Sequence, residues 1–218
     1  MKVNLVDNSR QNEELLSIMN NISEAVDYNM DKQEIFDRFL TYRRRMARLG
    51  AVQALYLYDF NNKQKNNEMN IFGALNLLGS KELCQEITSF YKNVFFTKQD
   101  YGLTKKNRKI DETFMFGIVN KAVNSIQEID DFIQSRLSGN WTTEKLDYVL
   151  RAIIRCAVAE ILLGESIEKA VLCSEYTNLA GNFFNTKEIG FINGIVDKLY
   201  TTVTKIYPFV NTKSTNKQ

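Results

Sequence analysis

The chain has 218 residues, of which 44% are hydrophobic and 25% are charged, and its formal net charge is only +2. These values are ordinary for a globular protein that can bury a core, and they exclude a polycation and an unstructured polar chain. Because the sequence contains no histidine, histidine-based nucleophile pairs, metal sites and proton shuttles are excluded as well.

The sequence also indicates where the protein works. No segment approaches the roughly 18 uncharged apolar residues of a membrane-spanning helix, and the N-terminal residues lack the apolar core of a secretion signal. We therefore expect a cytoplasmic protein that does not enter a membrane. The three cysteines are too far apart to predict a zinc site or a disulfide framework. Cys156 and Cys173 lie in apolar helical segments, so we expect them to be buried thiols.

The first 40 residues differ in charge from those that follow. They contain eight acidic and four basic side chains, for a net charge of −4. Only residues 15–19 suggest a short helix within a stretch rich in Asn, Ser and acids. We predict that residues 1–40 are an acidic, partly disordered or loosely docked extension. The main helical domain is then expected at residues 41–207, followed by a polar tail at residues 208–218.

A long helix is predicted at residues 31–60. Between residues 49 and 58 its only strongly polar side chain is Gln53, which is typical of a helix surrounded by other helices. Four arginines lie in the turns just before that segment, and residues 41–60 have a net charge of +3. The sequence therefore predicts a rigid helix whose middle is buried and whose basic end lies outside the core.

Further helices are predicted down to residue 137. A polar loop at residues 61–67 precedes helices at 71–78 and 83–96. Residues 98–109 form a second basic loop, with five basic side chains and one acidic side chain. Apolar residues then recur every three or four positions from residue 111 to residue 137, which predicts one long amphipathic helix.

The rest of the chain is also predicted to be helical. Helices are expected at residues 141–162, with Thr142 as the N-cap and Gly164 after the end, and then at residues 167–180 and 187–207. There is only one proline, no alternating strand pattern of useful length and no internal repeat. The predicted fold is therefore an all-α bundle, with a natural division near Gly139.

The arginine run is the main candidate for a binding site. Arg44 and Arg48 lie one turn apart on one face of the predicted helix, with Arg45 beside them. Guanidinium groups can bind successive phosphates and stack on unpaired bases. From the residues alone, a solvated helix face that only aids solubility is the alternative. The basic loop, which contains Lys105 and Lys109, could extend such a surface or simply be solvated.

Glu160 is an unexpected acid in an apolar helical segment. A buried carboxylate needs a partner. Arg151 and Arg155 lie too far round the same helix to be good partners, so an ion pair elsewhere in the fold and a contact with a basic partner protein are both open. We find none of the sequence motifs of nucleotide-binding or hydrolytic enzymes. The sequence thus predicts no catalytic residue, metal site or cofactor, and a protein that is not an enzyme.

Three ordered segments resemble the NusB family. Residues 43–56 (RRRMARLGAVQALY) closely resemble the opening of these proteins, in which an arginine run precedes an AVQALY helix. Residues 141–162 are similar to a second block, in which a tryptophan precedes a helix with an "LR.A..E" pattern. Residues 171–180 and 191–198 (FINGIVDK) are similar to the family's "NE…LA" and "FVNGVLDK" stretches. The resemblance covers about residues 42–200.

The resemblance implies a fold and a function. It implies an all-α fold of two small helical bundles. It also implies binding to boxA RNA together with the ribosomal protein NusE, and a role with the transcription elongation complex in antitermination and ribosomal RNA synthesis. Family members differ in oligomeric state, so a homodimer is among the expected states.

The resemblance also assigns site residues. Those expected to bind RNA are Arg44, Arg45 and Arg48, with Arg43 extending the run, the aromatic residue Phe191, and Lys187, which stands where the family can have an acid. Tyr56 and Glu160 match positions that contact the ribosomal protein. Two alternatives stay open: an RNA-binding module that serves a separate ribosomal-RNA-modifying enzyme, and a helical protein–protein adaptor whose arginines only aid solubility.

Overall fold

A computed structural model of the chain describes residues 32–65, 79–94, 110–164 and 167–208. Within these ranges the chain forms seven α-helices and one short 3-10 helix, and no strand. The prediction of an all-α fold is therefore confirmed. The elements are α2 (Lys32–Lys65), α3 (Ser80–Val94), α4 (Glu112–Asn124), α5 (Ile126–Gln134), η3 (Thr143–Lys145), α6 (Tyr148–Leu162), α7 (Lys169–Ala180) and α8 (Thr186–Ile206).

Some predicted features lie outside the described residues. These are most of the acidic extension, the helix at 71–78, the basic loop at 98–109 with Lys105 and Lys109, and the polar tail after Pro208. The boundary at residue 40 can be placed, because α2 begins at Lys32. That boundary therefore falls within a helix.

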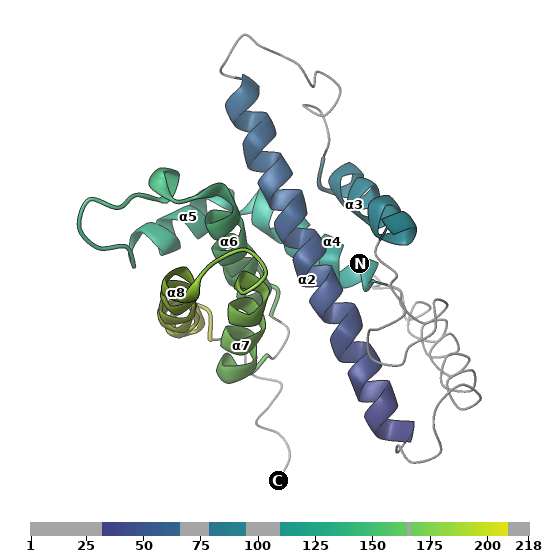
Figure 1. The fold of residues 1–218 in the computed structure, drawn as a ribbon. Coiled ribbons are helices and arrows are strands. Elements are labelled where there is room, and N and C mark those ends of the chain that lie inside the picture. Colours follow the sequence, from purple (N-terminus) through teal and green to yellow (C-terminus); the bar gives the residue numbers. More distant parts are fainter. Residues whose placement is uncertain (1–31, 66–78, 95–109, 165–166, 209–218) are drawn as a thin grey trace, which may run out of the picture.

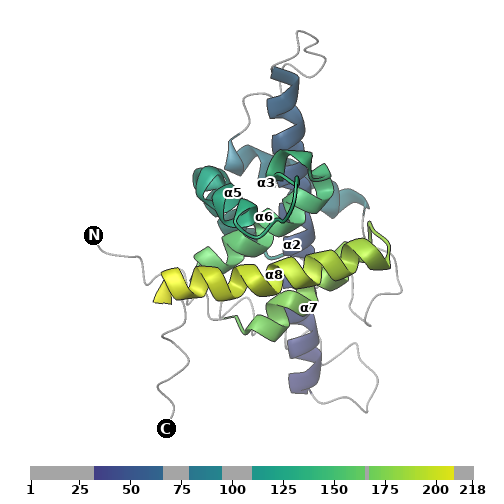
Figure 2. The same cartoon turned by 90° about the vertical axis from the view of Figure 1, so that its left-hand side faces the viewer.

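The helices form two groups on either side of α2. Figure 1 shows α3 on one side of this helix, α5 to α8 on the other, and α4 passing behind it. Both α4 and α6 pack against α2 and against each other, so the two groups share one core. Helix α8 is seen nearly end-on in Figure 1 and from the side in Figure 2, where it crosses the direction of α2. Because α5 packs on α6 and α8, the second group begins before the predicted division at Gly139.

Helix α6 is the centre of the core. Every residue from Arg151 to Ile161 is buried, including two arginines and Glu160. The predicted central segment, residues 49–58 of α2, is buried at Val52 and Leu55 but only half-buried at its end. Low polarity in that segment therefore reflects contact with neighbours on part of its surface. Cys156 and Cys173 are buried, as predicted.

Three local predictions were wrong. The segment at 61–67 is not all loop, since α2 continues to Lys65, and lysine and glutamine are good helix formers. The long helix at 111–137 is broken at Ser125, after Asn124, and both residue types favour helix ends over helix interiors. The next helix begins at Tyr148, because the Asp147 carboxylate accepts backbone hydrogen bonds at 2.8 and 3.2 Å and caps it there.

Two glycines fix the positions of these helices. Gly164 has a φ of 75° and ends α6, as predicted. Gly50 lies where α2 passes α3 and α4, and a Cβ atom there would be 2.6 Å from the sulfur of Met115 and 3.2 Å from Ile87. The absence of a side chain at Gly50 thus allows α2 to approach both helices closely.

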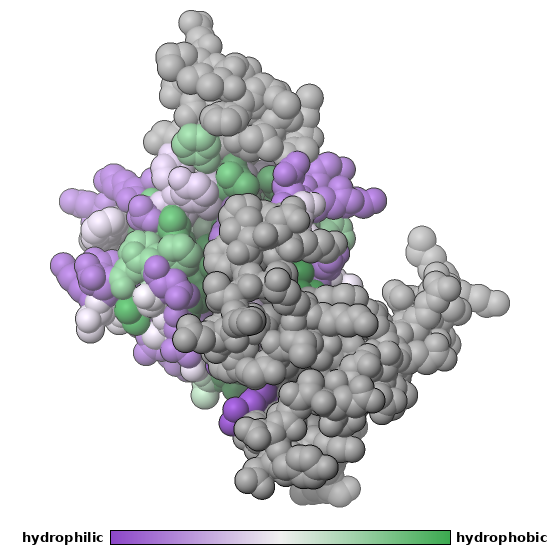
Figure 3. All heavy atoms as spheres, turned by 45° about the vertical axis from the view of Figure 1, so that its right-hand side comes forward, coloured by the Kyte–Doolittle hydropathy of each residue, from purple (hydrophilic) through white to green (hydrophobic). Residues whose placement is uncertain are grey.

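The surface of the described part is mixed in polarity. Figure 3 shows apolar areas between strongly hydrophilic ones on one face of the molecule. No helix in the described ranges is long and apolar enough to cross a membrane. The large apolar side chains that are exposed are Phe116, Trp141, Val171, Phe183, Phe191, Ile206 and Tyr207.

Candidate nucleic-acid interface

The arginine run lies on α2 and points in more than one direction. Arg44 and Arg45 are exposed, Arg43 is partly exposed, and Arg48 is buried with 4% of its surface accessible. Successive residues of a helix point about 100° apart, so a run of arginines cannot lie on a single face. The structure therefore separates one internal arginine from three that reach the surface.

Arg48 is held by carboxylates of two other helices. Its Nε and Nη2 donate to Glu160 of α6 at 2.9 and 2.7 Å, and its Nη1 donates to Glu175 of α7 at 3.2 Å. The hydroxyl of Tyr176 also donates to Glu160, at 2.8 Å. Burial alone would lower the pKa of Arg48, but the hydrogen bond and the charge of Glu160 raise it above its ordinary value. Arg48 is therefore a permanent internal cation.

Arg45 shares the second of these carboxylates. Its Nε donates to both oxygens of Glu175, at 3.0 and 3.1 Å, and its Nη2 donates at 2.9 Å. In contrast to Arg48, the Arg45 side chain is 46% exposed. Glu175 thus bridges a buried and a surface arginine. The forked contact fixes the direction of the Arg45 guanidinium while leaving much of it accessible.

Arg44 is positioned by an aromatic ring. Its guanidinium carbon lies 4.5 Å from the centre of the Phe114 ring on α4, and that of Arg48 lies 5.3 Å from the same centre. Cation–π contacts of this kind orient a guanidinium over the ring face. Because the Asp111 carboxylate caps the first turn of α4 at 3.1 Å, Phe114 itself is held in place. The surface arginines thus project from a rigid base.

The two predicted RNA-binding residues on α8 lie on a helix that packs against α7. Phe191 and Lys187 are both exposed. Helix α8 packs along α7, which supplies Glu175 to the arginines, and the hydroxyl of Thr177 on α7 donates to Asn193 on α8 at 3.3 Å. The structure therefore places these two residues on the helix next to the one that contacts Arg45.

The two residues predicted to bind a protein partner are not brought together. Tyr56 lies eight residues after Arg48, about 12 Å further along α2, and packs against Phe60 and Tyr148 with ring centres 6.3 Å apart in both cases. Glu160 is only 1% exposed, and its partner is Arg48. In this conformation neither Arg48 nor Glu160 faces solvent, so their roles toward RNA and a partner stay predictions.

A second buried ion cluster surrounds Asp59. Its carboxylate binds Arg151 at 2.8 Å and Arg155 at 2.6 Å, and Arg155 also binds Asp130 of α5 at 2.6 Å. Arg151 further donates to the backbone carbonyl of Thr143 at 3.2 Å. The sequence-based expectation that these two arginines are not partners of Glu160 agrees with this geometry.

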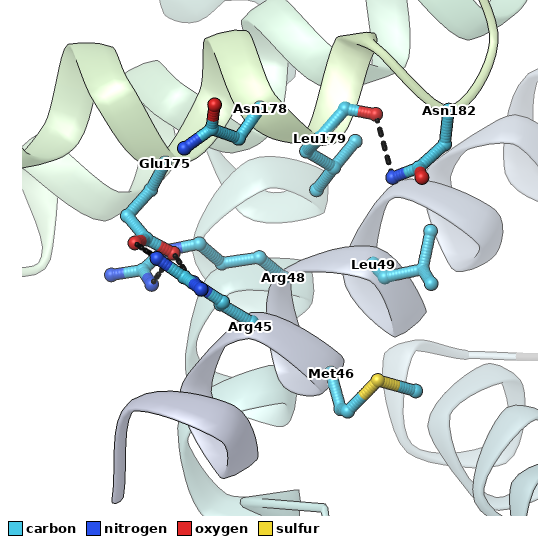
Figure 4. Close-up of a pocket in the computed structure, with 8 residues that line it drawn as sticks. All are labelled: Arg45, Met46, Arg48, Leu49, Glu175, Asn178, Leu179 and Asn182. Atoms are coloured by element: carbon cyan, nitrogen blue, oxygen red, sulfur yellow. Dashed lines mark hydrogen bonds and ion pairs between the residues drawn. The ribbon is translucent and has the colours of Figure 1, made fainter. Parts of the chain in front are cut away.

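A pocket of about 270 Å³ lies between α2 and α7. Figure 4 shows Arg45 and Arg48 meeting Glu175 at one end and the apolar side chains at the other, with two amides along the α7 side. The pocket thus adjoins one of the surface arginines, Arg45. Its lining residues are Arg45, Met46, Arg48, Leu49, Glu175, Asn178, Leu179 and Asn182.

Reasoning from the sequence missed several residues of this site. Glu175 is 127 residues from Arg48, and only the apolar positions around it on α7 indicated that it faces the core. Phe114 falls within the apolar repeat at residues 111–137, and nothing in that repeat indicates its contacts with two arginines. Asn178 lies on α7 and Asn182 lies in the turn that follows it, and nothing in the sequence shows that both line a pocket against α2.

Comparisons with known proteins identify relatives. Residues 90–201 match the model of the NusB family. The chain is 31% identical over 156 residues to the transcription antitermination protein NusB of Caulobacter vibrioides, covering 72% of this chain and 91% of that protein. It is 29% identical over 164 residues to the protein of that name from Rickettsia felis, covering 75% and 95%.

Solved structures share the fold. The solution structure of NusB from Aquifex aeolicus is 22% identical, with a TM-score of 0.51 over 81% of this chain and 95% of that one. A crystal structure of the antitermination factors NusB and NusE in complex with double-stranded RNA is 23% identical, with a TM-score of 0.51 over 74% and 98%. At these identities the likeness shows a common all-α fold.

Proposed function

Because the chain belongs to the NusB family, we propose that it is an RNA-binding transcription antitermination factor. In this proposal it binds boxA-type RNA together with the ribosomal protein NusE and supports the transcription and maturation of ribosomal RNA within the elongation complex. Its relatives bear the name of antitermination proteins, and a protein of the same fold was solved with NusE and RNA. The proposal gives the chain no catalytic role.

The observation that carries the proposal is the set of arginines at the surface of α2. Arg43, Arg44 and Arg45 reach the surface from consecutive positions. Arg45 is oriented by Glu175 and Arg44 by Phe114, so the charges are held in place before RNA arrives. Phosphate contacts from arginine supply much of the affinity of such interfaces. Pre-positioned guanidinium groups also lose less entropy on binding.

The proposed protein partner has a separate surface. Tyr56 is half-buried and lies far along α2 from the arginines, beside Tyr148. Tyrosines of this kind, with an apolar body and a polar hydroxyl, are common in protein interfaces. We place the contact with NusE near Tyr56. A homodimer, which the family resemblance allows, stays a prediction.

The experiment measures binding of a short boxA-like RNA across salt concentrations, with and without the ribosomal protein. The variant is Arg44→Ala/Arg45→Ala, and the matched control is Arg136→Ala/Lys145→Ala, which removes two exposed basic side chains elsewhere. Two lost phosphate contacts should reduce the log–log salt slope by roughly 1.4, at about 0.7 for each phosphate on a single strand. The control should keep the slope of the unmodified protein.

The result can also go against the proposal. If the unmodified protein does not bind the RNA even with the ribosomal protein present, the arginines only aid solubility and the chain is a protein–protein adaptor. If RNA binds but the ribosomal protein neither binds nor strengthens that binding, the chain is an RNA-binding module for another protein.

A further inference from the structure

The pocket between α2 and α7 has two kinds of wall. Met46 and Leu49 of α2 and Leu179 of α7 supply apolar surface, and the amides of Asn178 and Asn182 line the α7 side (Figure 4). A flat group with an apolar face and a polar edge would match both walls. The pocket is therefore suited to a heteroaromatic ring and less suited to an aliphatic side chain or an ion.

The two amides supply both donors and acceptors. The Nδ2 of Asn182 donates to the backbone carbonyl of Leu179 at 3.1 Å, which fixes this nitrogen on the helix and leaves Oδ1 as the outward acceptor. Asn178 is exposed, and its Nδ2 makes only a long contact of 3.4 Å with Ser174. Because an asparagine side chain offers two donors and an acceptor, it can bind the edge of a nucleobase.

The size of the pocket limits its occupant. Its volume of about 270 Å³ is below the roughly 300–1,000 Å³ of pockets that enclose drug-sized ligands. A single ring system fits this volume better than a whole nucleotide. The remainder of a nucleotide would lie outside, next to the charged end of the pocket.

The charged end is suited to the phosphate. Arg45 lines the pocket and keeps 46% of its side chain exposed, although Glu175 orients it. A phosphate joined to a base in the pocket would lie close to this guanidinium. Arg48 also lines the pocket, but it is bound by two carboxylates and contributes little to an incoming anion. The base site and the phosphate site are thus adjacent on the same two helices.

We propose that this pocket binds one unpaired nucleobase of the bound RNA while Arg45 contacts the adjacent phosphate. The inference rests on the proposed function, because it requires RNA on the arginine surface. Proteins read single-stranded RNA by turning bases out of the stack, placing them against apolar, aromatic or guanidinium surfaces and bonding their edges. The pocket supplies these contacts at one position of the RNA, and Arg45 at its charged end holds the adjacent phosphate.

The test replaces one nucleotide at a time in the short boxA-like RNA by an abasic nucleotide. With the unmodified protein, loss of the base that enters the pocket should weaken binding by about tenfold at one position. The variant Asn178→Ala/Asn182→Ala should bind the intact RNA more weakly and lose its sensitivity at that position. Its salt slope should be unchanged, because no phosphate contact is removed.

The matched control is Asn120→Ala/Asn124→Ala. These two asparagines are also four residues apart, on α4, where the Nδ2 of Asn124 donates to Asn120 at 3.1 Å near the surface. The control should retain the position-specific effect of the abasic nucleotide. Equal melting temperatures of both variants would show that neither substitution disturbs the fold.

Three results would overturn the inference. If the Asn178/Asn182 variant keeps the full abasic profile while the Arg44/Arg45 variant loses salt slope, RNA binding stands and the pocket is not a base site. If the Asn178/Asn182 variant weakens binding of the ribosomal protein instead, the occupant is a protein side chain. If the unmodified protein binds no RNA, the proposed function fails and this inference fails with it.

Discussion

Helix α2 takes part in two ion clusters, supplying the arginines of one and a carboxylate of the other. Near the middle of the helix, α2 supplies Arg45 and Arg48, and two other helices supply Glu160 and Glu175. Eleven residues after Arg48, α2 supplies the carboxylate of Asp59, α6 supplies two arginines and α5 supplies a second carboxylate. Each cluster therefore pairs two arginines with two carboxylates and carries no net charge.

The difference between them lies in which member is exposed. In the Asp59 cluster the most exposed side chain is a carboxylate, Asp130, at 23%. In the Arg48 cluster it is a cation, Arg45, at 46%, and it lines a pocket. Two clusters of equal charge thus present surfaces of opposite sign. We infer that the Asp59 cluster fastens α5 and α6 to α2, whereas the Arg48 cluster also orients a surface arginine for an anion.

The largest expected effect is that of Arg48→Met. This change leaves Glu160 buried with only the Tyr176 hydroxyl as a described partner. Breaking a buried pair from one side costs about 3–5 kcal/mol of unfolding free energy. Urea denaturation would measure this loss. The double variant Arg48→Met/Glu160→Met should recover most of it, and a single variant as stable as the unmodified protein would contradict the role of the pair.

The Asp59 cluster should respond less strongly. Asp59→Ala removes a partner from Arg151 and from Arg155, but Arg155 keeps Asp130 and Arg151 keeps the Thr143 carbonyl. We expect a loss of about 2–3 kcal/mol in urea denaturation. RNA affinity should not change, because no member of this cluster adjoins the pocket. A weaker RNA complex at equal stability would remove the distinction between the two clusters.

Alkaline pH should affect the Arg48 cluster. Burial, and then the charge of Glu160, raise the pKa of Tyr176 well above its usual value. The unfolded chain releases this proton near pH 10 and the folded chain keeps it. The contribution of Tyr176 to the free energy of unfolding is therefore fully present below pH 10 and is lost as pH rises further. Tyr176→Phe should cost about 1 kcal/mol at neutral pH and flatten the decline above pH 10. If the stability of Tyr176→Phe falls as steeply above pH 10 as that of the unmodified protein, groups other than Tyr176 cause the decline.

The buried thiols contribute to the same decline from a lower pH. Burial raises the pKa of Cys84 to about 12 and that of Cys156 well above its ordinary value. Their contribution to stability is therefore present below about pH 9 and is lost as pH rises toward the folded values. A Tyr176→Phe profile measured beside that of Cys84→Ala would separate the two contributions.

The smallest expected effect concerns RNA affinity. Glu175→Gln removes the charge that competes with phosphate for Arg45, while Arg48 keeps Glu160. Because Arg45 is 46% exposed, solvent screens its side of the pair, and the gain in RNA affinity should be at most a few-fold. Asp130→Asn is the matched change in the other cluster and should have no effect on RNA. Weaker RNA binding by Glu175→Gln would show that Glu175 mainly positions Arg45.

The helices were largely predictable because their cause is local. Apolar spacing gave α6, α7 and α8 to within a few residues at most boundaries, and the stop at Gly164 follows from its conformation. The break at Ser125 was not predicted, because the apolar periodicity of α4 and α5 passes through it with little interruption. The start at Tyr148 was missed because Thr142 and Asp147 are both acceptable caps, and only the packed structure selects between them.

The site was predictable in composition and only partly in geometry. The arginine run was found from its charge, yet its sequence did not show that Arg48 faces inward. Ala47 and Ala51 flank it on the buried side of α2, and that pattern was the available signal. Glu160 was recognised as an acid in need of a partner, but its partner is 112 residues away. Pairing across such distances depends on how helices pack, which no local pattern contains.

The length of α2 has a mechanical consequence. This single helix of 34 residues contributes to both ion clusters. The contacts of both clusters therefore depend on the position of α2 along its own axis. A slip by the rise of one residue, about 1.5 Å, would stretch the 2.7 Å Arg48–Glu160 contact and the 2.6 Å Arg155–Asp59 contact simultaneously. A force on Arg45 along the axis of α2 would therefore be opposed by both ion clusters, so the surface arginines keep their positions relative to the core.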